Sequence, residues 1–120
     1  MPAFSKATTI INIGHLPGHT QGKEALLREH GWSNVTSILS STPADEVKRL
    51  LKAAATPDGA VFLVGGAMMK GFPDLMADLL AFVAAECPSI LVHKTGPADF
   101  DASVTFPPGP SEAQVNQSHR

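Results

Sequence analysis

Two histidines, His15 and His19, stand four residues apart in the glycine-rich segment 14–23, directly after the apolar run 8–13. Histidine has an unperturbed pKa of about 6.5, so each ring can take up or release a proton near neutral pH. No G-x-S-x-G serine, second cysteine or pair of carboxylates in the glycine-rich segments offers another catalytic set. If the protein is an enzyme, we predict His15 and His19 as its catalytic residues, with acid–base chemistry of the lyase, isomerase or dehydratase type and no cofactor.

Metal binding is not expected at these histidines. His15 and His19 have the i, i+4 spacing of zinc ligands on a helix, but Pro17 and Gly18 prevent a helix from running through both. His93 would complete a three-histidine set, but the pattern is not that of a metal site. The single cysteine, Cys87, can form neither an internal disulfide nor a thiolate metal site, and we expect it to be structural.

A second glycine-rich segment, 65–71, follows the apolar run 60–64 and is predicted to be a loop facing the first segment. Glycine amides and a helix that begins at Thr20 would favour an anion, and Lys70 would add a positive charge. Met68 and Met69 carry flexible thioethers that adapt to an apolar ligand or close over it. We predict a small anionic or carbonyl-containing ligand, bound by Gly14, Gly18, Thr20, Gly65, Gly66, Met68, Met69, Lys70 and His93.

The glycines were also compared with nucleotide-binding loops. Segment 18–24 is one residue too short for a P-loop and has Glu24 where the hydroxyl belongs, which excludes a P-loop triphosphatase. Segment 18–20, Gly-His-Thr, resembles the glycine turn of the atypical short-chain dehydrogenase group, which implies an NAD(P)-binding or nucleotide-binding Rossmann-like module. The chain has no tyrosine for that group's Tyr-x-x-x-Lys pair. Such a module, and a non-catalytic oligomeric binding or assembly protein, are the alternatives to an enzyme.

Strands and helices are predicted to alternate along the chain. Apolar, β-branched runs predict strands at 8–13, 34–40, 60–64 and 90–93. A helix is expected over 21–30, with Thr20 as its N-cap and Gly31 just past its end. A second helix is expected to open with Thr42 as N-cap and Pro43 in the first turn, and a third to run over 73–86.

This alternation implies parallel strands joined by right-handed crossovers. We predict a single-domain three-layer α/β sandwich with a four-stranded parallel sheet in the order 2-1-3-4, a minimal flavodoxin-like or half-Rossmann fold. The ligand crevice would lie where the crossover direction changes, between the first and third strands. The α/β domain is expected over 1–106, followed by a proline-rich polar tail over 107–120.

Composition restricts the partners. The chain has 120 residues and a net charge of −2, with no basic stripe or aromatic ladder that would bind nucleic acid. No apolar run has the roughly 18 residues of a membrane span, and the first residues lack the apolar core of a signal peptide. We expect a cytoplasmic protein that binds neither nucleic acid nor membrane.

The third helix, 73–86, is apolar over more than one face. Only Asp74, Asp78 and Glu86 clearly face water in its pattern. Such a helix needs cover on two sides. The C-terminal segment could supply it, or a second copy of the chain, and we predict a homo-oligomer formed through this helix.

Overall fold

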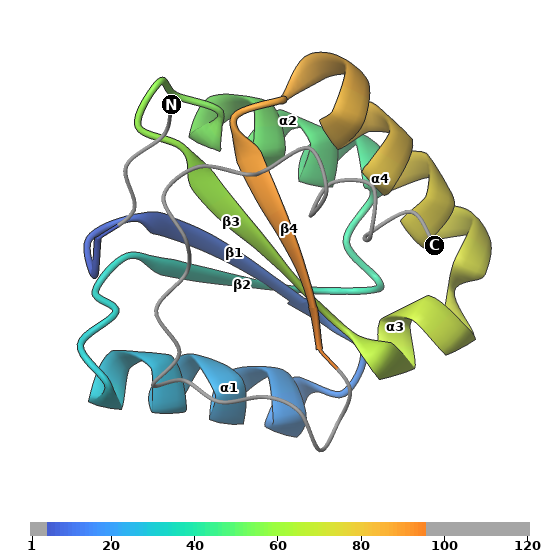
Figure 1. Cartoon of the computed structure of the whole chain (residues 1–120). Helices are drawn as coiled ribbons and strands as arrows, with labels where there is room; N and C mark the ends of the chain where they lie inside the picture. Colours follow the sequence, from blue (N-terminus) through green and yellow to red (C-terminus); the bar gives the residue numbers. More distant parts are fainter. Residues whose placement is uncertain (1–4, 96–120) are drawn as a thin grey trace.

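The computed structural model describes residues 5–95, which form a three-layer α/β sandwich (Figure 1). Four parallel strands make one sheet in the order β2-β1-β3-β4. This confirms the predicted fold class and strand order. The predicted boundary at 106 and the tail over 107–120 lie outside the described residues. The strands are β1 (Thr9–Gly14), β2 (Val35–Leu39), β3 (Ala60–Gly65) and β4 (Ile90–Thr95).

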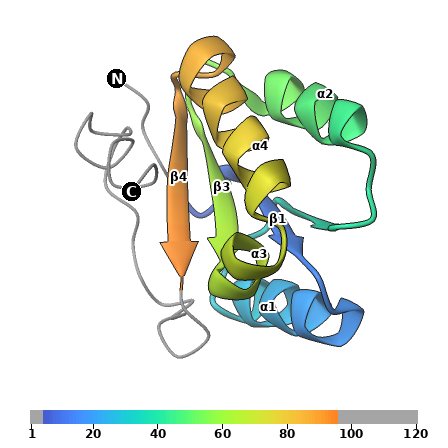
Figure 2. The ribbon, with the colours of Figure 1, turned by 90° about the vertical axis from the view of Figure 1, so that its right-hand side faces the viewer.

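Helices cover both faces of the sheet (Figures 1 and 2). One face carries α1 (Pro17–Glu29), and the opposite face carries α2 (Ala44–Ala54) and α4 (Pro73–Glu86). A short helix, α3 (Gly66–Gly71), connects β3 to α4. The chain therefore leaves the adjacent strands β1 and β3 toward opposite faces, which is the arrangement that opens a crevice at the carboxyl ends of parallel strands.

Two predicted helix starts and one predicted loop are wrong in detail. Helix α1 begins at Pro17 with Leu16 as N-cap, so Thr20 is not the cap. Proline at the first helical position has a suitable φ and no N–H to satisfy, which lets the helix start one turn earlier. Helix α2 has Pro43 as N-cap, without a side-chain cap from Thr42. Segment 65–71 is not a loop, because its last six residues form α3.

The end of α1 agrees with the sequence. Gly31 follows the helix with φ +94° and donates its backbone N–H to the Arg28 carbonyl. Glycine tolerates this left-handed conformation, which is why it commonly closes helices. The limits of α4 also agree, from Pro73 to Glu86.

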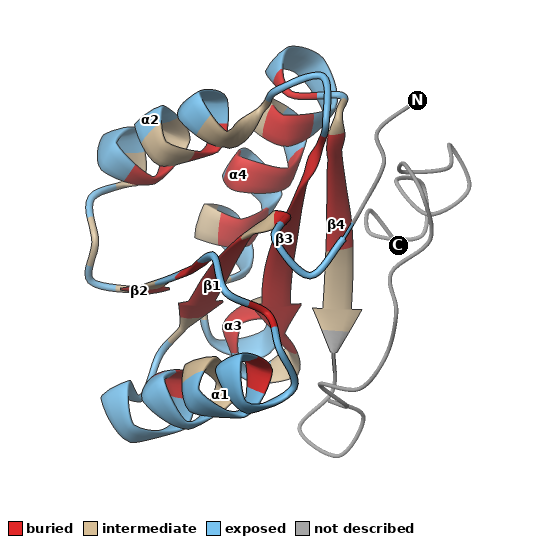
Figure 3. Cartoon of the chain, turned by 90° about the vertical axis from the view of Figure 1, so that its left-hand side faces the viewer, coloured by how far each residue is buried: buried red, intermediate tan, exposed pale blue. Residues whose placement is uncertain are grey.

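Two apolar clusters hold the layers together. The larger lies between the sheet and α2 and α4, and it includes Ile11, Ile13 and Phe62. The smaller lies on the α1 face, where Ile10 and Leu63 pack with Leu27 and Trp32. Strand β3 is buried along its whole length (Figure 3). Its unbroken apolar sequence therefore reflects cover on both faces, as expected for a central parallel strand.

Helix α4 is covered by its own chain more fully than its sequence suggested. Met76, Leu79, Leu80 and Val83 are buried, and Leu75 and Phe82 are half-buried against the larger cluster. Helix α2 packs beside α4, and the Lys48 amine lies 2.9 Å from the Asp78 carboxylate. Among residues 5–95, the exposed large apolar side chains are Leu16 and Leu26, both outside α4. Residues 5–95 therefore already bury most of the apolar side chains of α4, which its sequence suggested would need a second cover, and the homo-oligomer stays a prediction.

No helix within residues 5–95 has the length and apolar character needed to span a membrane.

Candidate ligand-binding site

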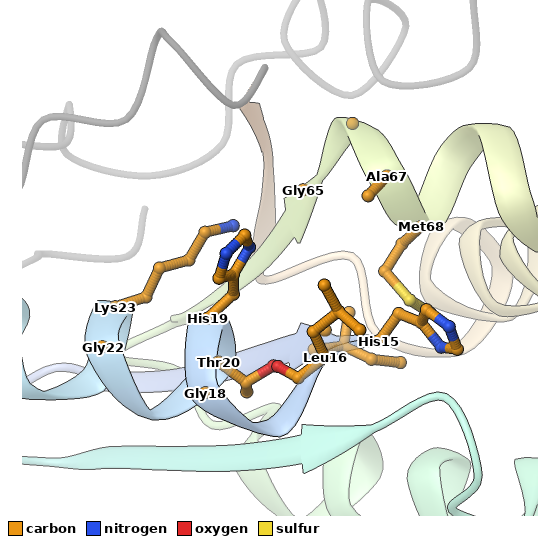
Figure 4. A pocket seen from close by; sticks show the side chains of 13 residues that line it. His15, Leu16, Gly18, His19, Thr20, Gly22, Lys23, Gly65, Ala67 and Met68 are labelled. Carbon is orange, nitrogen blue, oxygen red and sulfur yellow. The ribbon is translucent and has the colours of Figure 1, made fainter.

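A pocket of about 460 Å³ opens at the carboxyl ends of β1 and β3, between α1 and α3 (Figure 4). It lies at the point where the chain turns toward opposite faces of the sheet, which is where open parallel sheets bind ligands. None of the described residues that line it carries a carboxylate. They are Ile13, Gly14, His15, Leu16, Gly18, His19, Thr20, Gly22, Lys23, Gly65, Gly66, Ala67 and Met68.

One face of α1 forms a wall of the pocket. Gly18 and Gly22 are one helical turn apart, as are His19 and Lys23, so the four residues share adjoining rows of the helix surface. A Cβ added at Gly18 or Gly22 would meet no atom within 4 Å. These glycines therefore leave space in the pocket that any larger residue would occupy.

The first turn of α1 borders this space and begins with backbone donors that the helix itself does not satisfy. Pro17 has no N–H, and the Thr20 N–H donates to the Leu16 carbonyl at 3.0 Å. The amides of Gly18 and His19 precede the first intrahelical hydrogen bond and have no acceptor within the helix. Together with the helix dipole they make this end of α1 attractive to an anion.

Lys23 brings a side-chain amine to the same pocket. It is half-buried, and its Nζ would lie 2.8 Å from a Cβ at Gly65. Burial holds the pKa of Lys23 below its ordinary value of 10.5. Lys23 was not among the site residues predicted from the sequence. Its position four residues after His19, on the same helix face, was the available signal.

His15 and His19 both line the pocket, as their shared glycine segment predicted. His15 lies outside α1 and is exposed, with its Nδ1 3.0 Å from the Ser40 hydroxyl and its ring 4.9 Å from that of Phe72. His19 lies in the first turn of α1 and is also exposed. The two rings therefore approach the pocket from different elements, and His19 projects beside Lys23 in Figure 4.

Thr20 does not cap α1 but holds its first turn against the sheet. Its hydroxyl donates to the Leu16 carbonyl at 2.9 Å, and it contacts Gly14 so closely that a Cβ at Gly14 would overlap the Thr20 side chain. Gly14 is therefore needed for the first turn of α1 to lie against the end of β1.

Asn12 is a second residue beside this pocket that the sequence did not predict. It is completely buried on β1, where its Nδ2 donates to the Thr20 carbonyl and to the Ser37 hydroxyl, both at 3.1 Å. Asn12 thus connects the first turn of α1 to β1 and β2. An isolated polar residue in an apolar strand forms no spacing motif, so the sequence gave no sign of this role.

Ser37 also interacts with α1 through Glu24. A hydrogen bond from Ser37 and the nearby Arg28 hold the pKa of Glu24 below its ordinary value.

The opposite wall contains part of the predicted second segment. Gly65, Gly66 and Met68 line the pocket, and Met68 is buried. Within the described part of the chain, Met69 and Lys70 do not line it: Met69 packs against the larger apolar cluster, and Lys70 is exposed. The difference arises because α3 turns successive side chains to different directions, whereas a loop was expected.

His93 and Cys87 lie elsewhere. His93 is half-buried on β4 opposite Leu63, outside the described lining, and burial lowers its pKa. Cys87 is buried where α4 ends, at the edge of the sheet away from the pocket. Residues 5–95 contain no group of three or more histidine, cysteine or acidic side chains placed to hold a metal ion.

The chain matches no known protein family, and neither a curated protein nor a solved structure shows significant similarity to it.

Proposed function

We propose that this protein binds a small molecule bearing a carboxylate or phosphate group in the pocket between α1 and α3. The observation that supports this most strongly is that one cavity is lined both by the first turn of α1, with its backbone N–H donors, and by a lysine side chain. The first-turn residues Gly18 and His19 and the side chain of Lys23 all belong to the pocket wall.

The helix N-terminus and the lysine amine each add only a modest binding free energy. An anion at a helix N-terminus gains about 0.3–1 kcal/mol when exposed, and up to about 2 kcal/mol when partly buried. A lysine amine in a half-buried position adds a charge-assisted hydrogen bond, which is stronger than a neutral one. The pocket therefore favours ligands with a localised negative charge.

The rest of the pocket favours a compact, partly apolar ligand body. Ile13, Ala67 and Met68 line it, and the exposed Leu16 stands at its wall with 52% of its surface accessible. Binding would cover this leucine, which contributes about 25 cal/mol for each Å² of apolar surface removed from water. An anionic carbonyl compound has both the charge and the small carbon skeleton that such a lining suits.

The proposed function extends to catalysis without a cofactor. His15 and His19 line the pocket, and histidine can move a proton near neutral pH. We propose a cytoplasmic enzyme of lyase or isomerase type in which these rings exchange protons with the bound ligand. A Rossmann-like nucleotide-binding module is the second candidate, because the pocket lies at the topological switch between β1 and β3.

The test is a titration of ¹⁵N-labelled protein with inorganic phosphate, followed by amide chemical shifts. Shifts should saturate at Gly18, His19 and Gly65 and should weaken strongly in Lys23→Gln. Lys52→Gln is the matched control, because Lys52 is exposed on α2 and outside the described pocket lining. Equal weakening in both variants, or shifts scattered over the surface, would reject the proposal. If the same titration with NADH gives shifts at these residues at lower concentrations than phosphate does, the nucleotide-binding candidate is favoured.

A further inference from the structure

We infer that the ligand of this pocket has two polar ends, an acid group bound near Lys23 and a hydroxyl group bound by His15. This inference rests on the proposed anion site and specifies the class of ligand for it. Its basis is a cluster of three side chains from three different connections of the chain, at the end of the pocket away from Lys23. The cluster consists of His15, Ser40 and Phe72.

His15 is exposed, yet its ring is held by two neighbours. Its Nδ1 lies 3.0 Å from the hydroxyl of Ser40. Its ring lies 4.9 Å from that of Phe72 at an angle of 54°, within the range of attractive aromatic pairs. The hydrogen bond at one ring nitrogen decides which nitrogen carries the proton and how the ring is oriented. Ser40 therefore leaves Nε2 in a defined state, and a ligand hydroxyl suits either state because it both donates and accepts.

Ser40 is itself fixed to the end of β1. It is half-buried, and its backbone N–H donates to the Gly14 carbonyl at 2.8 Å. Gly14 lines the pocket and directly precedes His15. One residue after β2 thus contacts two successive residues after β1, through its backbone and through its side chain. This double contact sets the position of His15 before any ligand binds.

The His15 cluster and Lys23 lie on opposite sides of β1. Ser40 follows β2, and the amine of Lys23 lies against Gly65 at the end of β3. Strand β1 lies between β2 and β3 in the sheet, and neighbouring strands are about 4.8 Å apart, which gives roughly 10 Å from β2 to β3. A hydrogen bond takes about 3 Å at each end. A ligand with a chain of about three carbons between its two polar ends fits this span.

Figure 4 shows the same separation. Lys23 and His19 lie at one end of the pocket and His15 at the other, and the apolar side chains of Leu16 and Ala67 lie between them. A carbon chain between the polar ends would contact this apolar surface, which favours its burial. The two histidines then have different roles. His19 is near the acid group, and His15 binds the hydroxyl, the group with which it exchanges a proton in lyase or isomerase reactions.

The test compares three probes in the full chain: inorganic phosphate, propyl phosphate, and glycerol 3-phosphate, which has hydroxyl groups where propyl phosphate has none. Amide and histidine ring ¹⁵N shifts give the Kd and the residues affected. Glycerol 3-phosphate should bind about twofold to tenfold more tightly than propyl phosphate, the range expected for one neutral hydrogen bond. It alone should shift the ring nitrogens of His15, whereas all three probes should shift the amide of His19.

As a positioning residue, Ser40 should matter for one probe only. Ser40→Ala should remove the preference for glycerol 3-phosphate, keep the Kd of propyl phosphate, and change the ring shifts of His15 before any probe is added. Ser41→Ala, at the exposed next position, is the matched control and should behave as wild type. Equal weakening of both phosphate esters in Ser40→Ala, or a preserved preference, would contradict the positioning role.

The outcomes separate this inference from the proposed function. If the two esters bind equally while phosphate still shifts the Gly18 amide, the two-ended ligand is wrong and the anion site stands. If no probe gives localised shifts, both are wrong. The two esters are compared in the wild-type protein, so this result holds whether or not Ser40→Ala folds.

Discussion

Substitution of Gly18 by alanine should raise stability and weaken ligand binding at once. Gly18 lies in the first turn of α1, its φ is not positive, and a Cβ there would meet nothing within 4 Å. Replacing a glycine by alanine at a compatible position stabilises a protein by about 0.4–1 kcal/mol, chiefly by restricting the unfolded chain. For a chain of this size, that corresponds to a rise in Tm of roughly 2–5 °C.

The same methyl group would enter the pocket beside the amides that we propose bind the anion. Forcing an extra methylene-sized group into a packed contact costs about 1–3 kcal/mol, and 1.4 kcal/mol corresponds to a tenfold change in Kd. We therefore expect the Kd for inorganic phosphate to rise about tenfold in Gly18→Ala. Thermal unfolding and amide shift titration measure the two effects on the same sample.

Gly71→Ala is the matched control. Gly71 also has open space where its Cβ would be and no positive φ, but it ends α3 and does not line the pocket. It should gain a similar stability and keep the phosphate affinity of wild type. Wild-type phosphate affinity in Gly18→Ala would show that the bound anion does not use the space beside Gly18. A loss of stability would show that this space is not open to a methyl group.

Four further predictions concern other parts of the molecule. Asn12→Ala should lower the free energy of unfolding by about 1–3 kcal/mol, measured by urea denaturation, because it removes buried hydrogen bonds to the first turn of α1; a neutral effect would contradict that role. Lys23 has a pKa in the folded state below 10.5, so the unfolded chain binds more protons between the folded and unfolded values and stability should rise with pH there. Lys23→Gln should lack this rise. His93 has a folded pKa below 6.5, so stability should fall as pH drops below 6.5, and His93→Gln should reduce that fall. The predicted homo-oligomer through α4 requires light scattering at micromolar concentration to give more than the mass of one chain, and requires Ala81→Arg, at an exposed position of α4, to restore the monomer mass; a monomeric wild type would end this prediction.

The architecture could be predicted because its signals are local and repeated. Four apolar runs alternate with three helical segments, and the unbroken run in β3 indicated a strand covered on both faces. The two glycine segments then had to meet at the carboxyl ends of β1 and β3. Strand order and the location of the pocket both follow from this pattern without any knowledge of individual contacts.

The errors arose where two local signals competed. Thr20 and Pro17 are both good helix-start residues, and the sequence does not reveal which one the chain uses. The packing of Thr20 against Gly14 decides it, because the threonine is buried within the first turn and its hydroxyl is engaged by the Leu16 carbonyl. Met69 and Lys70 were assigned to the site because segment 65–71 was treated as a loop, whereas α3 imposes a helical period on it.

Asn12 and Lys23 escaped detection for a different reason, since each depends on contacts between distant residues. Asn12 stands in an apolar strand with no motif around it, and only the parallel pairing of β1 with β2 brings Ser37 within 3.1 Å of its amide. Lys23 gains its position from Gly65, which is 42 residues later in the chain. Contacts of this kind follow from the three-dimensional packing and leave no periodic trace.

The structure also explains why the donors in the first turn of α1 are well placed before any ligand arrives. The Thr20 carbonyl accepts a hydrogen bond from the buried Asn12 amide. The Thr20 side chain fits the space that Gly14 leaves at the end of β1. The first turn therefore cannot shift without breaking buried contacts to the sheet. Because folding has already fixed these amides, binding an anion need not meet the cost of ordering them. Asn12 and Gly14 thus belong to the binding site through rigidity, although neither needs to touch the ligand.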